Sequence, residues 1–505
     1  MISPTPPTPI EADPAATSDR LDGPRVAVPA DVLARLADSG AEVSTDDGHR
    51  AEAGRDWWPL AIGWAAAGQV PARPAAVVRP SSTAQVAEVL SICSRAGVPV
   101  TAAAGRSGVC GGAVPVFGGI SLDLTGLKGG LFDLDETSLL ADVAAGTFGP
   151  DLEAQLRASG SGYTLGHWPQ SMDLSTVGGW LACRSAGQYS TRYGKVEDMV
   201  IGLEVVLADG RVVRTEGAGP RAATGPNLTQ LFVGSEGTLG VITAARLVVH
   251  PVPPAEGRRA YGLASFAAGL EVCRRILRRG ATPAVLRLYD EVESQRNFEL
   301  TGTCALVVLD EADEGLLAAT LAVVDEEAAA GGAAALDAAL VGRWLEHRND
   351  VSALAPLWRA GIVVDTAEVA GRWSVLDGLA TTVTGELARL PGTLVASVHQ
   401  SHAYPDGACL YFTFAGRAPE GDESAGWAED YYRSAWDALT AVVLGRGAAI
   451  SHHHGIGLNR SRFLPEALGA GFSVLTALKA ALDPAGILNP GKLGLPSTHG
   501  AVPWP

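Results

Sequence analysis

Three consecutive histidines are the most conspicuous group of potentially reactive side chains in the sequence. They lie in the segment from Ser451 to Gly457, which reads Ser-His-His-His-Gly-Ile-Gly. Neighbouring side chains of an extended segment point in opposite directions, so at least one imidazole should face a site and another the protein interior. Consecutive histidines lack the i, i+4 spacing of helical zinc ligands. We therefore predict no metal, with a structural histidine run and an incidental metal site as the alternatives.

Small residues and hydroxyls crowd a second stretch, from Gly166 to Ala186. It places Ser175 and Thr176 next to paired glycines and shows neither helical nor strand periodicity. Glycine lets a backbone approach a ligand closely, and hydroxyls can bond phosphates or ring carbonyls. We therefore expect this backbone to lie against a flat, polar cofactor. An ordinary glycine-rich loop is the alternative.

Two more segments of small residues fit the same site. The segment from Gly234 to Thr243 reads Gly-Ser-Glu-Gly-Thr-Leu-Gly-Val-Ile-Thr, and the segment from Ala103 to Gly112 follows a short apolar strand at 98–100. An anion needs no side-chain partner where backbone amides converge on it. We expect the segments to form the walls of one binding site.

These segments resemble the FAD-binding domain of the vanillyl-alcohol-oxidase superfamily, and are most similar to its alkylglycerone-phosphate synthase branch. The match lies in the run Ser-Thr-Val-Gly-Gly-Trp from Ser175, in residues 193–198 and in residues 234–242, and it extends over about residues 70 to 495. The resemblance implies an α+β fold with a PCMH-type FAD-binding domain and an α/β cap domain of the FAD-linked oxidase C-terminal type. The cofactor-binding residues that it implies are Ala103, Ala104, Gly105, Arg106, Ser107, Gly108, Val109, Gln170, Ser171, Met172, Asp173, Leu174, Ser175, Thr176, Gly179, Cys183, Arg184, Ser185, Ala186, Ser235, Glu236, Gly237, Thr238, Leu239, Gly240 and Val241.

The phosphate-binding loop departs from the family pattern. It has alanines at 102–104 in place of the family's usual glycine triplet, and Arg106 is an unusually bulky residue for this loop; Arg106 either bonds the diphosphate or faces solvent. Covalent members of the superfamily carry a histidine near this loop, and none occurs between Gly105 and Leu124. We therefore predict that FAD is bound non-covalently.

The resemblance also implies the catalytic residues. Tyr411 matches a catalytic tyrosine, although a tyrosine in an aromatic strand is often a core residue. Arg287 matches an arginine suited to bidentate phosphate recognition, with a surface ion pair as the alternative. A second phosphate-binding arginine is represented by Arg348 or Arg359. The remaining catalytic residues that the resemblance implies are His167, His452, His453 and His454.

The implied activity is exchange of the acyl group of acyl-dihydroxyacetone phosphate for a fatty alcohol through an adduct at flavin N5, which forms an ether lipid. The alternative is an FAD-dependent oxidase or dehydrogenase of a 2-hydroxy acid such as D-lactate or glycolate. The Asn-Pro-Gly-Lys run at 489–492 resembles the ending of that branch of the superfamily. A third possibility is a catalytically silent flavoprotein. Tyr411 is the predicted acid/base partner, the histidines shape the site and Arg287 holds the phosphate.

Composition restricts the partners. The 505 residues carry a formal net charge of −17, which argues against a nucleic-acid binder, since phosphate contacts require a basic surface. No apolar run reaches the ~20 residues that a membrane span needs. Six scattered cysteines predict reduced thiols in a cytoplasmic protein, and the ending Val-Pro-Trp-Pro is no peroxisomal signal. We predict a small-molecule or lipid substrate and leave open a homodimer and peripheral membrane contact.

The order of predicted elements suggests five segments. Helices are expected at 32–37, 84–96, 149–159, 266–279, 316–330 and 465–482, and strands at 98–100, 120–124, 139–145, 201–208, 304–309, 393–398 and 409–414. We predict a disordered tail over 1–27, an N-terminal segment over 28–70, an FAD-binding domain over 71–254, a cap and substrate domain over 255–440 and a C-terminal lobe over 441–495.

Overall fold

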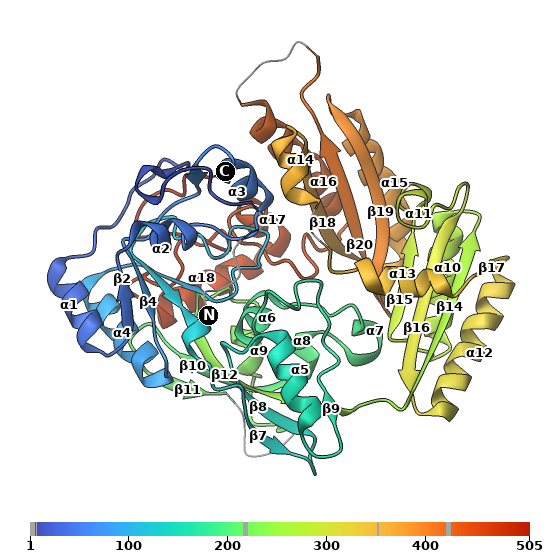
Figure 1. Ribbon diagram of the computed structural model, residues 1–505, viewed down its shortest axis with the longest axis horizontal. Helices are drawn as coiled ribbons and strands as arrows, with labels where there is room; N and C mark the ends of the chain where they lie inside the picture. Colours follow the sequence, from blue (N-terminus) through green and yellow to red (C-terminus); the bar gives the residue numbers. More distant parts are fainter. Residues whose placement is uncertain (1–5, 7, 216–220, 351–352, 421–425, 505) are drawn as a thin grey trace.

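Two domains and a C-terminal lobe make up the computed structural model, which describes residues 6, 8–215, 221–350, 353–420 and 426–504. The first domain spans 8–254, the cap domain 255–445 and the C-terminal lobe 446–504. Figure 1 shows the first domain in blue to green, with the cap domain beside it in yellow to orange and the lobe in red. Helices and sheets are mixed in both domains, so the fold is α+β, as predicted.

The first domain contains a four-stranded and a five-stranded sheet. In the four-stranded sheet, of order β2-β4-β6-β5, the last three strands run parallel. The five-stranded sheet, of order β11-β10-β12-β8-β7, is antiparallel. The strands of this domain are β1 (Ser18–Asp19), β2 (Glu42–Ser44), β3 (Gln69–Val70), β4 (Ala76–Arg79), β5 (Val100–Ala103), β6 (Ile120–Asp123), β7 (Leu131–Asp135), β8 (Leu140–Ala144), β9 (Tyr163–Thr164), β10 (Val200–Val206), β11 (Val212–Arg214), β12 (Val241–Val248) and β13 (His250–Pro251).

Helices cover these sheets where the sequence predicted amphipathic segments. In α4 the apolar residues Val86, Val89, Leu90 and Cys93 are buried at helical spacing, and the Ser82 hydroxyl caps its first turn. The helices of the domain are α1 (Ala30–Asp38), α2 (Asp47–Glu52), α3 (Pro59–Ala65), α4 (Thr83–Ala96), α5 (Gly149–Ala158), α6 (Val177–Cys183), α7 (Ser190–Tyr193), α8 (Val196–Met199) and α9 (Thr229–Phe232).

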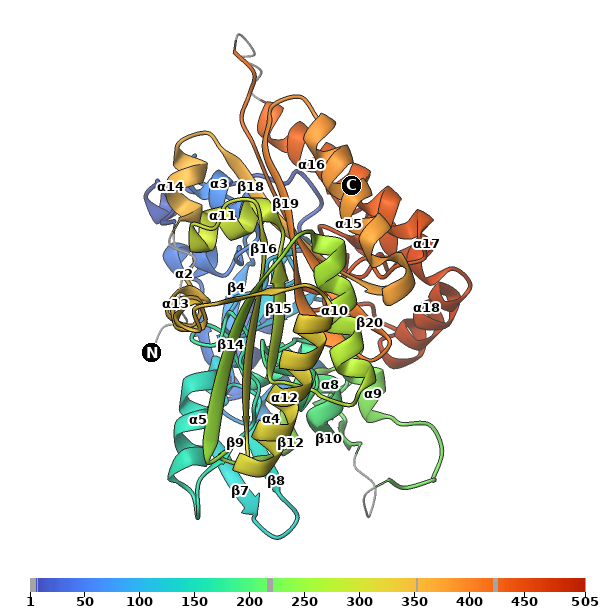
Figure 2. The same ribbon diagram turned by 90° about the vertical axis from the view of Figure 1, so that its right-hand side faces the viewer.

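The cap domain is built on one antiparallel sheet of order β17-β14-β16-β15-β19-β20-β18. Four helices cover one face, and α11, α13 and α14 lie on the other side (Figure 2). The strands are β14 (Ala255–Leu263), β15 (Val285–Tyr289), β16 (Cys304–Ala312), β17 (Ala334–Leu336), β18 (Val363–Arg372), β19 (Thr393–Tyr404) and β20 (Gly407–Gly416). The helices are α10 (Phe266–Arg278), α12 (Glu314–Ala330), α15 (Trp373–Arg389) and α16 (Trp427–Gly445) on the covered face, and α11 (Glu291–Phe298), α13 (Ala339–His347) and α14 (Leu354–Arg359) on the other.

The register of this sheet places polar residues of separate strands side by side. Tyr411 on β20 is paired with Glu368 on β18 and with His399 on β19. Side chains two residues apart along a strand share a face, so Thr366 lies on the same side as Glu368. A register shift between Gln400 and His402 changes the direction in which the side chains at the end of β19 point. A row of polar side chains therefore faces the first domain.

The C-terminal lobe returns to the first domain. Val100 at the start of β5 donates to the Ile487 carbonyl and accepts from the Asn489 amide. The predicted helix at 465–482 is two helices, α17 (Leu464–Leu468) and α18 (Gly471–Leu482). The single-helix prediction is wrong because Gly469 adopts φ 53° and ψ −129°, which ends α17. Helix α16 (Trp427–Gly445) extends past the predicted domain boundary at 440.

Residues 8–27 form part of the folded protein. Ser18 and Asp19 pair with Gln69 and Val70, and Leu21 is buried in the main core. The buried Arg55 donates to the Thr8 carbonyl at 2.7 Å. The prediction of a disordered tail is therefore wrong for these residues, because their prolines and small residues pack against the N-terminal segment. Residues 1–5 and 7 lie outside the described residues.

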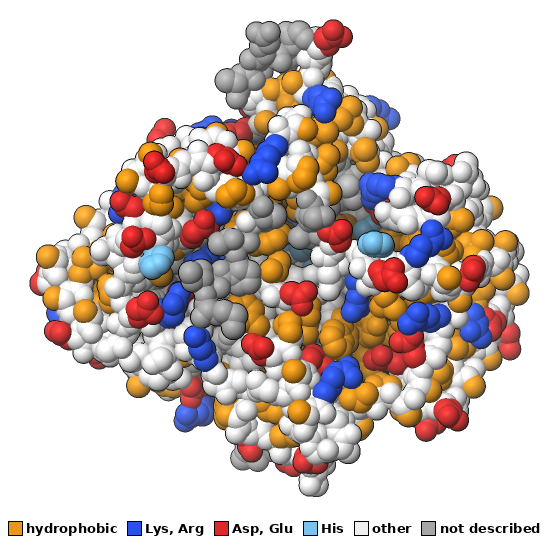
Figure 3. All heavy atoms as spheres, viewed as in Figure 1, with side chains coloured by type: hydrophobic (Ala, Val, Ile, Leu, Met, Phe, Trp, Pro, Cys, Tyr) orange, Lys and Arg blue, Asp and Glu red, His pale blue; other side chains and the backbone are white. Residues whose placement is uncertain are grey.

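No helix in the described part of the chain combines the length and the apolar character needed to cross a bilayer. On the face in Figure 3, Lys and Arg are scattered among Asp and Glu and form no basic field. All six cysteines are free thiols.

Deletion of residues 1–27 should lower the melting temperature of the protein by several degrees. The deletion exposes the pocket of Leu21 and leaves the buried Arg55 with Glu52 as its remaining partner. Thermal unfolding followed by circular dichroism measures the change. Deletion of residues 1–5 is the control, since it keeps these contacts; equal melting temperatures for both deletions would contradict the packing described here.

Candidate active site

One cavity lies where the first domain, the cap sheet and the C-terminal lobe meet. All three predicted small-residue segments line it, which brings together residues that are far apart in the sequence. The predicted cofactor-binding residues on its wall are Ala103, Ala104, Gly105, Arg106, Ser107, Gly108, Val109, Gln170, Ser171, Leu174, Ser175, Thr176, Gly179, Cys183, Ser185, Ala186, Glu236, Gly237, Gly240 and Val241.

Six predicted cofactor-binding residues lie off this wall. Met172 and Leu239 are core residues, and Asp173 is exposed. The Arg184 guanidinium lies 3.5 Å from the Glu197 carboxylate. Ser235 and Thr238 close a turn in which the Thr238 hydroxyl donates to the Ser235 carbonyl. Their contact with a cofactor stays a prediction, since a motif contains residues that shape the loop as well as residues that face the cavity.

The glycines of the wall fit a large, flat ligand. A Cβ added to Gly105 would lie 2.0 Å from the Leu174 carbonyl oxygen, so this glycine lets two walls touch. At Gly108, Gly112 and Gly237 an added Cβ would meet no protein atom closer than 3.4 Å. Packing of the chain therefore does not require glycine at Gly108 and Gly112, which leaves room for a ligand to approach the backbone closely, whereas Gly237 has φ 72°, a conformation that favours glycine. These residues fit the dinucleotide that the resemblance implies.

Residues 177–183 form helix α6, although the stretch from Gly166 to Ala186 showed no periodicity that we recognised. Thr176 caps the helix by accepting from the Gly179 amide, and Val177, Trp180 and Leu181 are buried on one side at i, i+3 and i+4. Gly178 lies against Ala145, where an added Cβ would be 2.8 Å from the Ala145 Cβ. The short amphipathic helix was not recognised in the sequence because of its paired glycines.

Arg106 occupies a backbone conformation that favours glycine, with φ 51°. It lines the cavity, and burial lowers the pKa of its guanidinium. Contact of Arg106 with a diphosphate stays a prediction.

Glu368 on β18 organises the histidine segment. Its Oε1 accepts hydrogen bonds from the amides of His452, His453 and His454 at 3.2, 3.1 and 2.7 Å, and from the Ser451 hydroxyl at 2.7 Å. Both oxygens also accept from Arg460. Burial alone would raise the pKa of Glu368, but Arg460 and His454 outweigh it and hold the pKa well below its ordinary value.

A second glutamate holds the other end of this segment. The carboxylate of Glu236, on the third small-residue loop, accepts from the Ile456 and Gly457 amides at 2.6 and 2.8 Å. Glu236 has φ 49°, a conformation that an L-residue rarely adopts. The segment is thus fixed by one carboxylate from each domain.

The three histidines have different environments. His453 and His454 line the cavity, whereas His452 does not. His454 Nδ1 lies 3.0 Å from Glu368 Oε2, which leaves Nε2 for the cavity. His452 uses Nδ1 toward His453 and Nε2 toward the Tyr404 hydroxyl, at 2.9 and 3.1 Å. Burial lowers the pKa of His452 and His453 well below the ordinary value. These two imidazoles are therefore neutral near pH 7.

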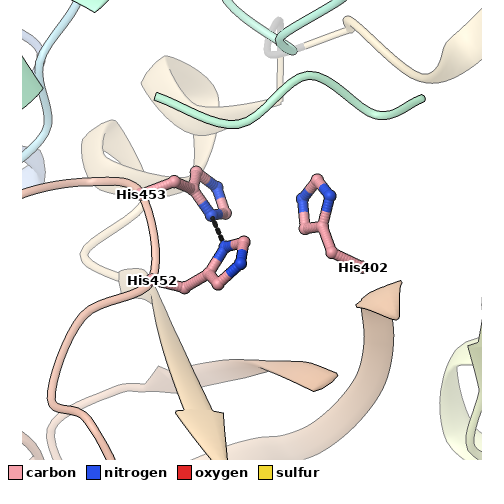
Figure 4. A group of neighbouring side chains, drawn as sticks. All are labelled: His402, His452 and His453. Carbon is pink, nitrogen blue, oxygen red and sulfur yellow. Dashed lines mark hydrogen bonds between the residues drawn. The ribbon is translucent and has the colours of Figure 1, made fainter. Parts of the chain in front are cut away.

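His402, His452 and His453 lie close enough for one ring nitrogen of each to surround a metal ion (Figure 4). His402 Nδ1 is 2.8 Å from the Ser190 hydroxyl, and the bonds of His452 engage both of its ring nitrogens. Hydrogen bonds to protein groups therefore account for this cluster, and the absence of a metal stays a prediction.

Tyr411 lies at the centre of the polar row. Its ring stacks on that of His399 with centroids 4.8 Å apart, and the Thr366 hydroxyl donates to its oxygen at 3.0 Å. Burial raises the pKa of Tyr411. Since Thr366 is the donor, the Tyr411 proton is available to another acceptor in the cavity.

Two arginines converge beside Tyr411. The guanidiniums of Arg287 and Arg348 lie 5.8 and 5.6 Å from the ring centroid of Trp344, and both line a polar chamber that Tyr411 also borders. Arg359 instead forms an exposed ion pair with Glu11. Of the two candidates for a second anion-binding arginine, only Arg348 is positioned for this role.

His167 is buried and does not line the cavity. Its Nε2 lies 3.3 Å from the hydroxyl of Ser185, which does line it, and its ring packs on Trp180. Burial lowers the pKa of His167 to about 3, so it is neutral. Among the described residues, His167 contacts the cavity wall through Ser185 and Trp180.

Sequence reasoning missed several acids at the cavity. Burial raises the pKa of Asp56 to about 7 and that of Asp365 to about 6. Asp56 accepts from the amides of Trp58 and Ala113 and so ties residues 56–58 to the end of the phosphate-binding loop. Burial likewise lowers the pKa of Lys492 to about 7. For the missed residues that lie on strands, such as Thr366 and Glu368, a polar residue at every second position of the sequence could have identified them.

Comparison with known proteins agrees with this architecture. The family described as "FAD binding domain" matches residues 74–216, and "FAD linked oxidases, C-terminal domain" matches residues 253–493. An uncharacterised FAD-linked oxidoreductase of Escherichia coli O157:H7 is 31% identical over 83% of this chain and 89% of its own length. Alkyldihydroxyacetonephosphate synthase of Dictyostelium discoideum is 29% identical over 84% of this chain and 74% of its own. A solved structure of an alkyldihydroxyacetonephosphate synthase, 24% identical, has the same fold, with a TM-score of 0.77 over 97% of this chain and 89% of that one.

Replacement of Glu368 with Gln should lower the free energy of unfolding by about 3–5 kcal/mol, because it leaves Arg460 buried without a charged partner. The depressed pKa means that ionised Glu368 stabilises the fold above its ordinary pKa of 4.5 and loses this effect as pH falls. The variant should therefore lose less stability on acidification than the wild type.

Urea unfolding of the FAD-loaded proteins at several pH values measures both effects. Glu386→Gln is the matched control, since its pair with Arg389 is exposed and contributes about 0–1 kcal/mol. A Glu368 variant as stable as this control would contradict the role of the carboxylate.

Proposed function

This chain belongs to the family of FAD-linked oxidases, and we propose that within it the protein is an alkylglycerone-phosphate synthase-like enzyme. It would exchange the acyl group of acyl-dihydroxyacetone phosphate for a fatty alcohol, giving the ether and a free carboxylate. FAD binding and enzymatic character come with the family. The 29% identity to the Dictyostelium synthase supports the narrower activity.

The arginine pair carries this proposal. Arg287 and Arg348 converge on Trp344 beside Tyr411, and burial lowers the pKa of Arg348. Arg287 Nε has no hydrogen-bond partner among the described residues, and neither does Arg348 NH1. Two half-buried guanidiniums that line one polar chamber match the charge of a phosphate dianion, whereas a simple hydroxy acid offers one carboxylate.

The chemistry divides between the cofactor and the chain. Bound FAD supplies a ring that exchanges an electron pair with the three-carbon unit of the substrate. The small-residue segments of the first domain would hold the cofactor. The protein excludes water, holds the phosphate and moves protons, and no net oxidation occurs in this exchange.

Two side chains are placed for proton transfer. Tyr411 keeps its proton because burial raises its pKa, so it can donate to the departing carboxylate. His454 Nδ1 lies 3.0 Å from Glu368 Oε2, so Nε2 is the ring nitrogen that can accept the proton lost from C1 of the substrate. Their rings are 5.6 Å apart, close enough to serve one substrate carbon.

The rival function is oxidation of a 2-hydroxy acid, which the name of the C-terminal family favours. Either Arg287 or Arg348 could hold its carboxylate, and His454 could accept the hydroxyl proton. That reaction reduces the flavin, whereas acyl exchange leaves it oxidised at the end of each turnover. The two functions therefore differ in the flavin spectrum as well as in the product.

Incubation of the purified holoenzyme with acyl-dihydroxyacetone phosphate and labelled hexadecanol should give a labelled ether lipid without lasting flavin reduction. Tyr411→Phe should slow the reaction about 10²–10⁴-fold, because it removes the acid. Tyr261→Phe is the control, since Tyr261 lies on β14 and bonds to Asp325. No ether product, together with anaerobic bleaching of the flavin by glycolate or D-lactate, would overturn the proposal.

A further inference from the structure

A chain of three side chains linked by hydrogen bonds runs behind the anion site. Arg287 NH2 lies 2.6 Å from His399 Nε2, and His399 Nδ1 lies 2.7 Å from Glu293 Oε2. Glu293 is 1% exposed and His399 is 6% exposed. The three residues come from β15, β19 and α11, so the chain of contacts is a tertiary arrangement.

The donors and acceptors of this chain fix the tautomer of His399. A guanidinium has only donors, so Nε2 must accept from Arg287 through its lone pair. Nδ1 therefore carries the hydrogen and donates it to Glu293. His399 is thus a neutral imidazole between a cation and an anion.

The surroundings hold the imidazole in this state. Its ring stacks on Tyr411 and lies 5.2 Å from the ring centroid of Tyr289. Glu293 also accepts from the hydroxyls of Ser397 and Thr413 at 2.9 and 3.2 Å. Arg296 lies 3.2 Å from the same carboxylate. Burial lowers the pKa of His399 despite the opposing effect of Glu293, in agreement with the neutral form.

We propose that His399 is a positioning residue: through Nε2 it holds the Arg287 guanidinium in the orientation that binds the anionic group of the substrate, while Glu293 fixes its tautomer. One arm of Arg287 is used by this bond, and the guanidinium also lines the cavity and the polar chamber in which the anion would bind. A long arginine side chain loses rotamer freedom when it binds, so prior fixation strengthens binding. The inference rests on the proposed function only for the identity of the anion.

Binding of sulfate to the holoenzyme tests the proposal without turnover. Sulfate is a dianion over the whole working range, and flavin difference absorbance at about pH 8, where an ordinary histidine is neutral, reports its dissociation constant. His399→Phe keeps the stacking on Tyr411 but removes both ring nitrogens, and should weaken sulfate binding about tenfold or more. His399→Gln places an acceptor near Nε2 and should stay within about threefold of the wild type.

Controls separate positioning from folding. His49→Phe, at an exposed position on α2, should leave sulfate binding unchanged. All variants are checked for FAD content and for unfolding by urea. In the Arg287→Met background, His399→Phe should not weaken sulfate binding further, because His399 affects binding through its hydrogen bond to Arg287.

Several results would overturn the assignment. These are an unchanged dissociation constant in His399→Phe, equal weakening in the Phe and Gln variants, additive effects in the Arg287→Met background, or no sulfate binding by the wild type. Sulfate binding that follows the expected pattern in an enzyme that forms no ether would support the role of His399 and refute the proposed function alone.

Discussion

Burial of the Glu368 carboxylate is the constraint on which the site depends. A fully buried charge is stable only if its oxygens are satisfied, and here three consecutive amides, a hydroxyl and Arg460 do so. These donors lie in the C-terminal lobe, whereas Glu368 lies on the cap sheet. Glu236 repeats the arrangement from the first domain. The histidine segment is therefore fixed between two carboxylates, one from each domain.

This arrangement gives the cap sheet its catalytic face. The fixed histidine segment places the His454 ring next to the Tyr411 ring on β20. The register of β19 places His399 on the other side of Tyr411, next to the anion site. The first domain supplies the opposite wall from three segments whose glycines admit a flat ligand. Proton transfer, anion binding and cofactor binding thus occupy adjoining parts of one cavity, which suits either acyl exchange or hydroxy-acid oxidation; the arginine pair favours the first.

The sequence was most informative where local chemistry decides the structure. Amphipathic helices such as α4 and the three small-residue segments were found because capping, periodicity and glycine content are local properties. Glu368 and His399 were missed because their roles come from partners more than 80 residues away. The N-terminal tail was misjudged because its composition does not show that Thr8 and Leu21 meet a surface built by later residues. The choice between Arg348 and Arg359 likewise required the tertiary structure.

Amide hydrogen exchange at residues 452–454 of the FAD-loaded protein tests the central claim most directly. If Glu368 holds these three amides, they should exchange as slowly as the amides of the cap strands β18 and β20, although they lie in no helix or strand. Exchange at the rate of an exposed loop would show that the buried carboxylate does not organise the segment, and would contradict the account of the site.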